Sequence, residues 1–401
     1  MKKNLPYITA VLCCCGLAMA GLSLASNCAG LFFMPVAQSL GVNLGEVSLY
    51  LTINNLVMGF AAAPAVKLCR KYDMRRVLGV CVVLSFGTYF FMSRVTATWQ
   101  LYLLAGLNGG LNAFYGMAMI SVVIGNWFFK SMGLASGVAF SFSGLASSFL
   151  TMVLSWVIQN HGWRQAYMLN AFLVVASVLP AILFLHFAPE MAGLAPYGGT
   201  KPAGKQNAKE QQTGKVALFP VLCVIVLCAS FVCGMCTQFS GVGTSVGMNA
   251  TVAAMMVSAT MVGNTISKLC MGVLCDKLGA RYAMFIILGT TAAGLAAIFA
   301  FAGLGSAAIL LPAALCAGMA FSICGVGMSN LAKEVYGAAA FSAMYPSLSL
   351  YVCIGGAVAH TIIGFSFDIF GSYYPALGVC AALCLLCIAA VQFIYKRENK
   401  I

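Results

Sequence analysis

Charge is scarce in this sequence, and acidic charge is scarcest. Only 7% of the 401 residues are Asp, Glu, Lys or Arg, while 62% are hydrophobic. A soluble domain carries roughly 25% charged residues, so a soluble globular fold is excluded. The eight acids lie outside the centres of the apolar runs, at Glu46, Asp73, Glu190, Glu210, Asp276, Glu334, Asp368 and Glu398. Proton transfer by a carboxylate deep in a membrane is therefore disfavoured.

Motifs for catalysis are also missing. The sequence contains no nucleophile elbow, no Walker loop and no His/Cys cluster with metal-ligand spacing. We therefore expect no enzyme activity, no catalytic residue, no cofactor and no metal, and ATP-driven transport is disfavoured. The 18 cysteines lie mostly in apolar runs, where Cys packs as a small hydrophobe. The pairs Cys233/Cys236 and Cys384/Cys387 are interpreted as packing, and no disulfide framework is expected.

Long apolar segments are what the sequence does have. A helix that crosses the hydrocarbon layer needs about 20 apolar residues, and the period-two alternation of a membrane barrel is missing. The sequence therefore predicts an all-α membrane protein with twelve transmembrane helices in two six-helix bundles. The expected spans are 7–32, 43–66, 76–95, 99–124, 132–158, 165–187, 216–240, 248–273, 280–303, 306–330, 341–366 and 371–395.

The basic residues predict the orientation of these spans. With twelve spans, all but two of the 21 Lys and Arg residues fall on one side, and only Arg94 and Arg164 fall opposite. Basic loops stay in the cytoplasm. We therefore expect a multi-pass protein of the inner (plasma) membrane with both termini cytoplasmic, and we assign the net charge of +13 to these loops rather than to nucleic acid. The alternative, cleavage after Ala18-Met19-Ala20 as a signal peptide, would leave an odd number of spans.

A polar stretch divides the chain. Residues 188–215 read as a flexible cytoplasmic linker between an N-terminal bundle, 1–187, and a C-terminal bundle, 216–401. Landmarks recur at similar spacing, such as Lys130 and Lys333 after spans four and ten. Parallel repeats joined by a linker are a known transporter plan.

The loop after span eight carries glycines, an acid and cations at fixed spacing: Gly272, Asp276, Lys277, Gly279 and Arg281. This pattern resembles the signature loop of the major facilitator superfamily. The first-half loop is degraded, with Arg70 where the acid is expected and Asp73 where the glycine is. The resemblance implies alternating access, with gating by Asp276, Lys277 and Arg281 and by Asp73, Arg75 and Arg76. Asp276 is expected to hold the inward face closed by binding a basic loop or a helix N-terminus.

Two further stretches resemble the oxalate:formate antiporters and monocarboxylate carriers. They are the start of span five, from Asn126-Trp127-Phe128-Phe129-Lys130 to Ala139, and the start of the linker, from Pro189 to Gly198. In that group a cation on span eight faces the anion, eight residues before the signature acid. The resemblance implies this role for Lys268, a Lys in place of the family's Arg and therefore a point charge rather than a bidentate fork.

The oxalate-type members also carry a Lys on span eleven near a Tyr. Here Tyr345 is present, but Leu348 stands at the Lys position. This loss argues against a small dianion such as oxalate.

Polar residues inside the spans are candidates for substrate contact. Lys268 and His360 are the ionisable ones; snorkelling to the cytoplasmic surface is the alternative for Lys268, and hydrogen-bonded packing for His360. Asn108, Asn112 and Tyr115 share a face of span four. The expected lining is completed by Asn264, Asn27, the adjacent Asn54 and Asn55 of span two, and Tyr345. Buried amides need partners, so some of these residues are expected only to bridge helices.

Three functions are compatible with these features. The first is a secondary carrier for a small organic anion, monocarboxylate-like, as an exchanger or a proton symporter. The second is efflux of drug-like neutral molecules through a cavity lined by the 22 Met and 27 Phe residues. The third is a membrane sensor or assembly factor, which the lack of a soluble domain disfavours. The expected partners are a small-molecule substrate, a coupling proton or counter-anion, and the lipid bilayer; the resemblance implies a monomer.

Overall fold

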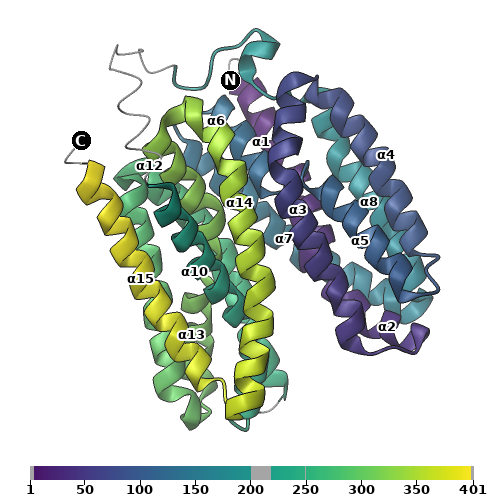
Figure 1. The fold of residues 1–401 in the computed structure, drawn as a ribbon, viewed down its shortest axis with the longest axis vertical. Helices are drawn as coiled ribbons and strands as arrows, with labels where there is room; N and C mark the ends of the chain where they lie inside the picture. Colours follow the sequence, from purple (N-terminus) through teal and green to yellow (C-terminus); the bar gives the residue numbers. More distant parts are fainter. Residues whose placement is uncertain (1–3, 200–217, 249, 399–401) are drawn as a thin grey trace. The chain divides into compact units, whose positions relative to one another are not determined.

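The computed structural model describes residues 4–199, 218–248 and 250–398, and this part of the chain is almost entirely helical (Figure 1). No strand forms within these residues; the one extended contact is an isolated bridge between Phe128 and Tyr197. Helices satisfy their backbone groups internally, which a segment surrounded by lipid requires. The all-helical fold expected from the sequence is confirmed.

The first half of the chain forms α1 (Leu5–Ala18), the π-helix η2 (Met19–Asn27), α2 (Gly30–Leu40), α3 (Leu44–Lys71), α4 (Met74–Met92), α5 (Thr98–Asn112), α6 (Met117–Trp127), α7 (Met132–His161), α8 (Trp163–Phe184) and the short η3 (Pro189–Ala192). The second half forms α10 (Phe219–Thr237), α11 (Phe239–Ser245), α12 (Ala250–Phe301), η4 (Ala302–Leu304), α13 (Ala307–Gly318), the π-helix η5 (Ile323–Gly327), α14 (Met328–Phe370) and α15 (Tyr374–Glu398).

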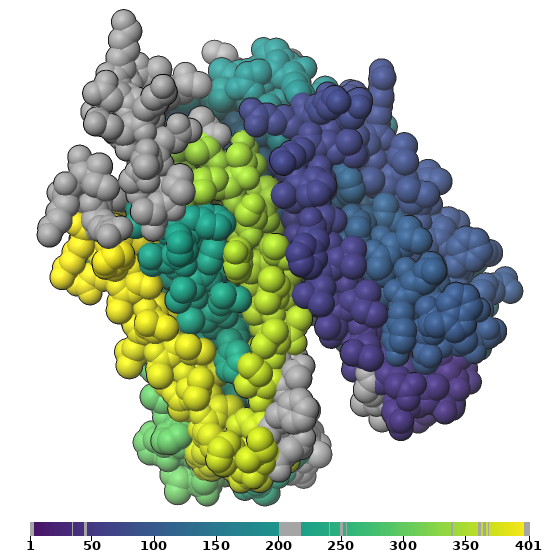
Figure 2. All heavy atoms as spheres, viewed as in Figure 1, coloured from purple at the N-terminus to yellow at the C-terminus, as the bar shows by residue number. Residues whose placement is uncertain are grey.

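The helices pack into two compact units. Within the described residues, the first unit is built from Met1–Lys130, Val138–Thr200 and Ser342–Leu350, and the second from Ser131–Gly137, Lys201–Phe341 and Tyr351–Ile401. In the first unit α4 packs against α5 and α8 (Figure 1). In the second unit α12 packs against α13, and α15 (yellow) lies along α10 (teal), as the space-filling view shows (Figure 2).

Eleven stretches of the described chain are long and apolar enough to cross a membrane. One of them, Met255–Leu304, has 50 residues. At 1.5 Å per residue it would be about 75 Å long, more than twice the hydrocarbon thickness. Gly279 interrupts it with φ 84° and ψ 162°, a region of backbone space that is essentially restricted to glycine. Two lengths of helix therefore meet at this residue, and α14 is divided in the same way at Gly337.

Large apolar side chains cover much of the surface of both units. The most exposed include Phe60, Val83, Phe91, Trp99, Phe149, Met152, Trp156, Phe172, Ile369 and Leu385. An apolar surface of this extent is suited to lipid. The protein is therefore a multi-pass membrane protein.

Three expected spans are less regular than the sequence predicts. The span expected at 7–32 contains the π-helix η2, the span at 99–124 breaks between Asn112 and Met117, and the span at 306–330 breaks after Gly318 and continues through η5. Apolar composition persists through these breaks, so hydropathy does not reveal them. The ends of α5 and α13, Asn112 and Gly318, are 206 residues apart.

Candidate functional site

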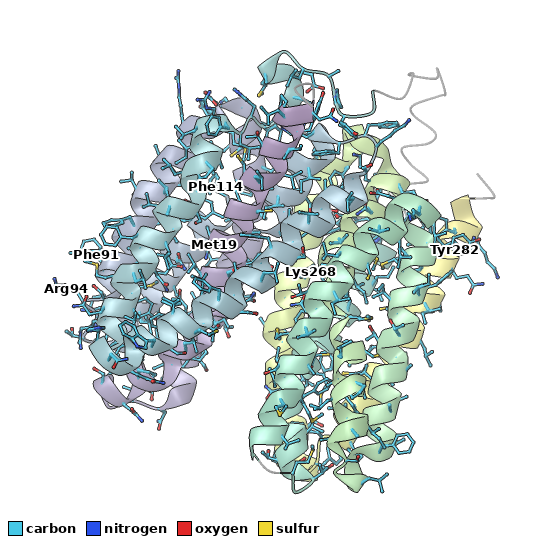
Figure 3. All side chains as sticks on the ribbon, turned by 180° about the vertical axis from the view of Figure 1, so that it is seen from behind. Met19, Phe91, Arg94, Phe114, Lys268 and Tyr282 are labelled. Carbon is cyan, nitrogen blue, oxygen red and sulfur yellow. The ribbon has the colours of Figure 1, made fainter. Side chains whose placement is uncertain are left out.

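Among the Lys and Arg residues that the structure describes, Lys268 is a buried one within an apolar helix. It lies in α12 of the second unit and its side chain is only 9% exposed (Figure 3). One turn earlier, Asn264 is 4% exposed, and its buried Oδ1 has no hydrogen-bond partner among the described residues. Lys268 and Asn264 therefore place two buried polar side chains one turn apart on the same helix.

Asp276 binds the start of α7. Its two carboxylate oxygens accept hydrogen bonds from the backbone N–H groups of Gly133 and Leu134, at 2.9 Å and 2.7 Å. These are free N–H groups of the first helical turn, where the helix dipole also favours negative charge. Lys333 interacts electrostatically with the same carboxylate. The contact lies wholly within the second unit, which includes Ser131–Gly137.

Glycine permits this close packing. A Cβ on Gly133 would collide with the carbonyl oxygen of Gly272, and one on Gly272 would collide with that of Gly133. A Cβ on Gly137 would lie 2.7 Å from the carbonyl oxygen of Lys268. Gly133 and Gly137 at the start of α7 therefore pack closely against the helix that carries Lys268.

The other signature-loop residues have separate environments. The side chain of Lys277 is exposed. The guanidinium of Arg281 lies over the rings of Tyr282, Phe285 and Tyr395, with the Tyr395 centroid at 5.3 Å. Glu334, which the sequence analysis did not select, accepts a 3.1 Å hydrogen bond from the N–H of Ala280, where α12 resumes after Gly279. In the sequence, Glu334 is marked only by its position next to Lys333.

The residues of the first-half loop make contacts within their own half of the chain. Asp73 is the N-cap of α4, and its Oδ1 accepts a 3.1 Å hydrogen bond from the N–H of Arg75. Nε of Arg75 donates to the carbonyl oxygen of Ile182 on α8 at 3.0 Å. Arg76 and Arg70 are exposed. The predicted gating residues are therefore divided between two loops in different units.

The amides of span four form a buried cluster in the first unit. Asn108 donates to Tyr50 at 3.1 Å and to Asn54 at 3.3 Å, and Asn112 donates to the same Asn54 oxygen at 3.2 Å. Asn54, Asn108 and Asn112 are each at most 2% exposed. These hydrogen bonds join α5 to α3. The amides of span four therefore bridge helices, as the sequence analysis expected of some buried amides. Asn54 was expected in the lining together with Asn55, whereas Tyr50 was not selected, although its i, i+4 spacing to Asn54 on span two is a visible signal.

Tyr115 and Asn27 lie on other parts of this unit. The Tyr115 hydroxyl is 3.3 Å from Ser85 Oγ, and Asn27 at the end of η2 donates to Ser147 Oγ on α7 at 2.8 Å. Asn55 is partly exposed on α3, while Tyr345 is 2% exposed. His360 lies in α14, but its side chain is outside the described part of the structure.

The two cations expected on the opposite side lie at one end of the first unit. Arg164 stacks on Trp163 at 4.3 Å and donates to the carbonyl oxygen of Val95, the residue next to Arg94. Figure 3 labels Arg94 just beyond α4. These contacts are compatible with both loops lying on one side of the membrane.

A sequence comparison identifies the family. A profile described as the Major Facilitator Superfamily matches residues 11–360. The chain belongs to the major facilitator superfamily. This family consists of membrane transporters, so the general predictions of fold and of transport are confirmed. In the described residues, no group of three or more His, Cys, Asp or Glu side chains is arranged to hold a metal ion.

Named relatives within the superfamily are distant. The oxalate:formate antiporter of Oxalobacter formigenes is 25% identical over 292 residues, which is 70% of this chain and 66% of the antiporter. Monocarboxylate transporter 1 of Bos taurus is 25% identical over 184 residues, 46% of this chain and 35% of the carrier. Monocarboxylate transporter 13 of Rattus norvegicus is 21% identical over 360 residues, 89% of this chain and 81% of the carrier. The chain thus spans just under two thirds of the antiporter and about a third of the bovine carrier.

Solved structures of major facilitators share the fold. The transporter FucP in an outward conformation superposes with a TM-score of 0.70 at 14% identity, covering 96% of this chain and 98% of FucP. A variant of the E. coli fucose:proton symporter FucP gives 0.69 at 15% identity, covering 97% and 98%. At such identities the likeness establishes the fold alone.

The two stretches that resemble the antiporter and carrier group meet in the first unit. The N–H groups of Phe129 and Lys130 donate to the carbonyl oxygen of Tyr197 at 2.9 and 3.1 Å, and the N–H of Tyr197 donates to Trp127 at 2.8 Å. The Tyr7 ring packs against Trp127, Phe128 and Tyr197. The first residues of the predicted linker are therefore anchored to the segment that leads into α7.

Proposed function

We propose that this major facilitator carries a small organic anion, of the monocarboxylate type, by alternating access. The observation that supports this most directly is the buried Lys268. A cation at the centre of a membrane helix costs about 2.5–3.5 kcal/mol on insertion scales, so its retention needs a compensating function. At 9% exposure it is enclosed by protein, which favours anion binding over snorkelling. The adjacent Asn264 offers an amide for a carboxylate oxygen.

The substrate proposed for Lys268 is a monoanion. A single Lys provides one positive charge and three donors without the bidentate geometry of Arg. Leu348 stands where oxalate-type members carry a second cation. The similar proteins are named for oxalate and formate exchange and for monocarboxylate transport, and one charge in the site favours the second kind of cargo. A coupling proton or a counter-anion would complete the cycle.

The proposed architecture has twelve spans. Residues 1–187 and 216–401 would form six-helix bundles joined by a cytoplasmic linker at 188–215. The interruption of Met255–Leu304 at Gly279 supports twelve rather than eleven crossings. The spacing of 206 residues that separates the ends of α5 and α13 also separates the starts of α3 and α12. We place a monomer in the inner membrane with both termini cytoplasmic.

Gating is assigned to the two cytoplasmic loops. Asp276 would stabilise one state by holding the start of α7, and loss of that contact would accompany opening, since only differential contacts shift a two-state equilibrium. Lys277 and Arg281 belong to the same loop. Asp73, Arg75 and Arg76 would act in the first-half loop through local contacts.

Transport in proteoliposomes tests the role of Lys268. Lys268→Gln should lower uptake of labelled monocarboxylates about tenfold to a hundredfold, since losing a charged hydrogen-bond partner costs about 1.5–3 kcal/mol, whereas Lys268→Arg should keep measurable uptake. Lys67→Gln, the same change at an exposed position of α3, is the control. Full uptake by Lys268→Gln would reject the assignment. Export of neutral compounds by both wild type and Lys268→Gln, with no carboxylate uptake by either, would favour the efflux alternative.

A further inference from the structure

One apolar span of the first unit, Thr98–Trp127, is interrupted along its length. α5 ends at Asn112 and α6 begins at Met117, and residues 113–116 between them are not helical; Figure 3 labels Phe114 in this break. Gly116 precedes α6 with φ −79° and ψ −176°, and no side chain caps the helix. A helix N-terminus therefore lies inside an apolar span rather than in a loop.

The start of α6 leaves backbone donors without partners. The first hydrogen bond that reaches back to the carbonyl oxygen of Gly116 comes from Ile120, at 3.1 Å. In the described part of the chain, the N–H groups of Met117, Ala118 and Met119 make no hydrogen bond. An unpaired N–H group is costly where water is excluded, and the helix dipole adds positive potential at this end. These donors therefore call for a partner that accepts hydrogen bonds.

A buried side chain adds a donor to the same region. Asn54 of α3 is 0% exposed, and its Nδ2 has no hydrogen-bond partner among the described residues. Its Oδ1 accepts a 3.2 Å hydrogen bond from Asn112, where α5 ends. One turn later on α3, the Sδ of Met58 lies 3.4 Å from the Cβ position of Gly116. This face of α3 therefore follows the break, and the N–H groups of α6, which point back along the helix axis, point toward the level of Asn54.

The break is enclosed by neighbouring segments but remains accessible. A Cβ on Gly21 of the π-helix η2 would lie 2.7 Å from the carbonyl oxygen of Tyr115, so η2 packs closely on the break. A π-helix is rare and is frequent at functional sites. Phe114 and Met117 are partly exposed, which leaves a route for a small ligand.

The groups at this break favour an anion over water. A carboxylate accepts several hydrogen bonds at once and donates none, whereas a water molecule must also place its own protons. An unpartnered acceptor, Asn108 Oδ1, belongs to a residue one turn farther from α6. We propose that the N-terminus of α6 and the Asn54 amide bind a small monovalent anion, a carboxylate or a halide. Nothing in this site depends on Lys268, which lies in the second unit.

The experiment measures anion binding by the purified full-length protein. Its thermal unfolding midpoint is followed against sodium formate concentration in a zwitterionic buffer, because a ligand of the native state raises the midpoint by mass action. The same series with sodium chloride separates a carboxylate site from a halide site. A rise that saturates is expected in wild type and also in Lys268→Gln, in which the proposed substrate site of the second unit is removed.

Met117→Pro removes one donor of the site in the Lys268→Gln background. Proline suits the first position of a helix, and the extended backbone of Gly116 is compatible with a following proline. Formate or chloride should bind roughly tenfold more weakly or worse, as expected for a lost hydrogen bond to a charged group. Thr98→Pro makes the same change at the start of α5; it is the control and should leave the affinity unchanged.

Asn54→Asp tests the side-chain donor. It keeps an oxygen that can accept from Asn112 and places an oxygen where Nδ2 was, so it should also weaken binding by roughly tenfold or more. No saturable rise in Lys268→Gln with either anion would mean that water alone fills the break, and would leave the proposal for Lys268 standing. Equal affinities in Met117→Pro and Thr98→Pro would also overturn this site. Midpoints without anion show which variants fold; if Met117→Pro does not, Asn54→Asp decides.

Discussion

The two signature loops of this protein use their acids in different ways. In the first half Asp73 accepts a hydrogen bond from Arg75, two residues further along the chain. In the second half Asp276 accepts two from Gly133 and Leu134 of another helix, α7. The residue aligned with Asp276 in the first loop is Arg70, which has no acceptor atoms. The first loop therefore cannot hold a helix N-terminus through this position.

The Arg residues of the two loops make more similar contacts than the acids do. Arg75 donates to Ile182 on α8, and Arg281 lies over Tyr395 on α15. Each contacts the last helix of its own half of the chain. The two loops thus place an Arg against the last helix of their own half, but their acids bind different partners. The loops are comparable as scaffolds, and the acid-to-helix contact is specific to the second one.

The largest effect is expected from removing the acid of the second loop. Asp276→Ala leaves two N–H groups of α7 without charge-assisted partners, and hydrogen bonds to charged groups are worth about 1.5–3 kcal/mol. Asp73→Ala removes one local cap, worth about 1 kcal/mol. Thermal unfolding of the purified proteins should give a clearly larger drop in midpoint for Asp276→Ala.

Asp276→Asn sharpens the comparison. Asn keeps one acceptor oxygen and should lie between wild type and Asp276→Ala, while Asp73→Asn, a good N-cap, should be close to wild type. Equal destabilisation by Asp73→Ala and Asp276→Ala would remove the asymmetry between the loops.

The next effect concerns the residue that starts the helix after each loop. Gly279 has φ 84° and ψ 162°, whereas Asp73 at the matching place has φ −60° and ψ 114°. Gly279→Ala should therefore destabilise the protein by about 1–3 kcal/mol, the usual cost of a strained backbone. Gly289→Ala is the control, because Gly289 is helical and has open space around its Cβ position. It should leave the unfolding midpoint unchanged or raise it; a similar loss in both variants would show that the Gly279 backbone is not the cause.

The fold was predictable because hydropathy, span length and charge sidedness all depend on local composition. The helix breaks were not, because Asn112–Met117 and η5 remain apolar where the helical hydrogen bonding changes. The binding of Asp276 to a helix N-terminus could be inferred from the signature loop. Its particular partner, Gly133 on α7, depends on long-range packing.

The sequence indicated which polar residues belong to the candidate site, but it did not indicate which partners their side chains bind. Asn108 and Asn112 were recognisable as one polar face of span four, but the sequence does not show that both donate to Asn54. Cys233 and Cys236 have redox-like spacing in the sequence, whereas in the structure the Cys236 thiol donates to the carbonyl oxygen of Ala317 on α13. Such pairings join segments far apart in the chain, which spacing alone cannot reveal.

The smallest expected effect tests how the second loop replaces a cap that the first loop carries itself. Asp73 caps α4 from within its own loop, but Gly279 has no side chain, and the N–H of Ala280 is bound by Glu334 instead. Glu334→Ala should cost about 1 kcal/mol, the usual value for a lost cap, and less at high salt because the acid is exposed. Glu190→Ala removes an exposed acid elsewhere as the control. Two results would contradict this assignment: equal falls in unfolding midpoint for both variants, or no salt dependence of the fall in Glu334→Ala. Either result would mean that Glu334 does not cap the helix that begins at Ala280.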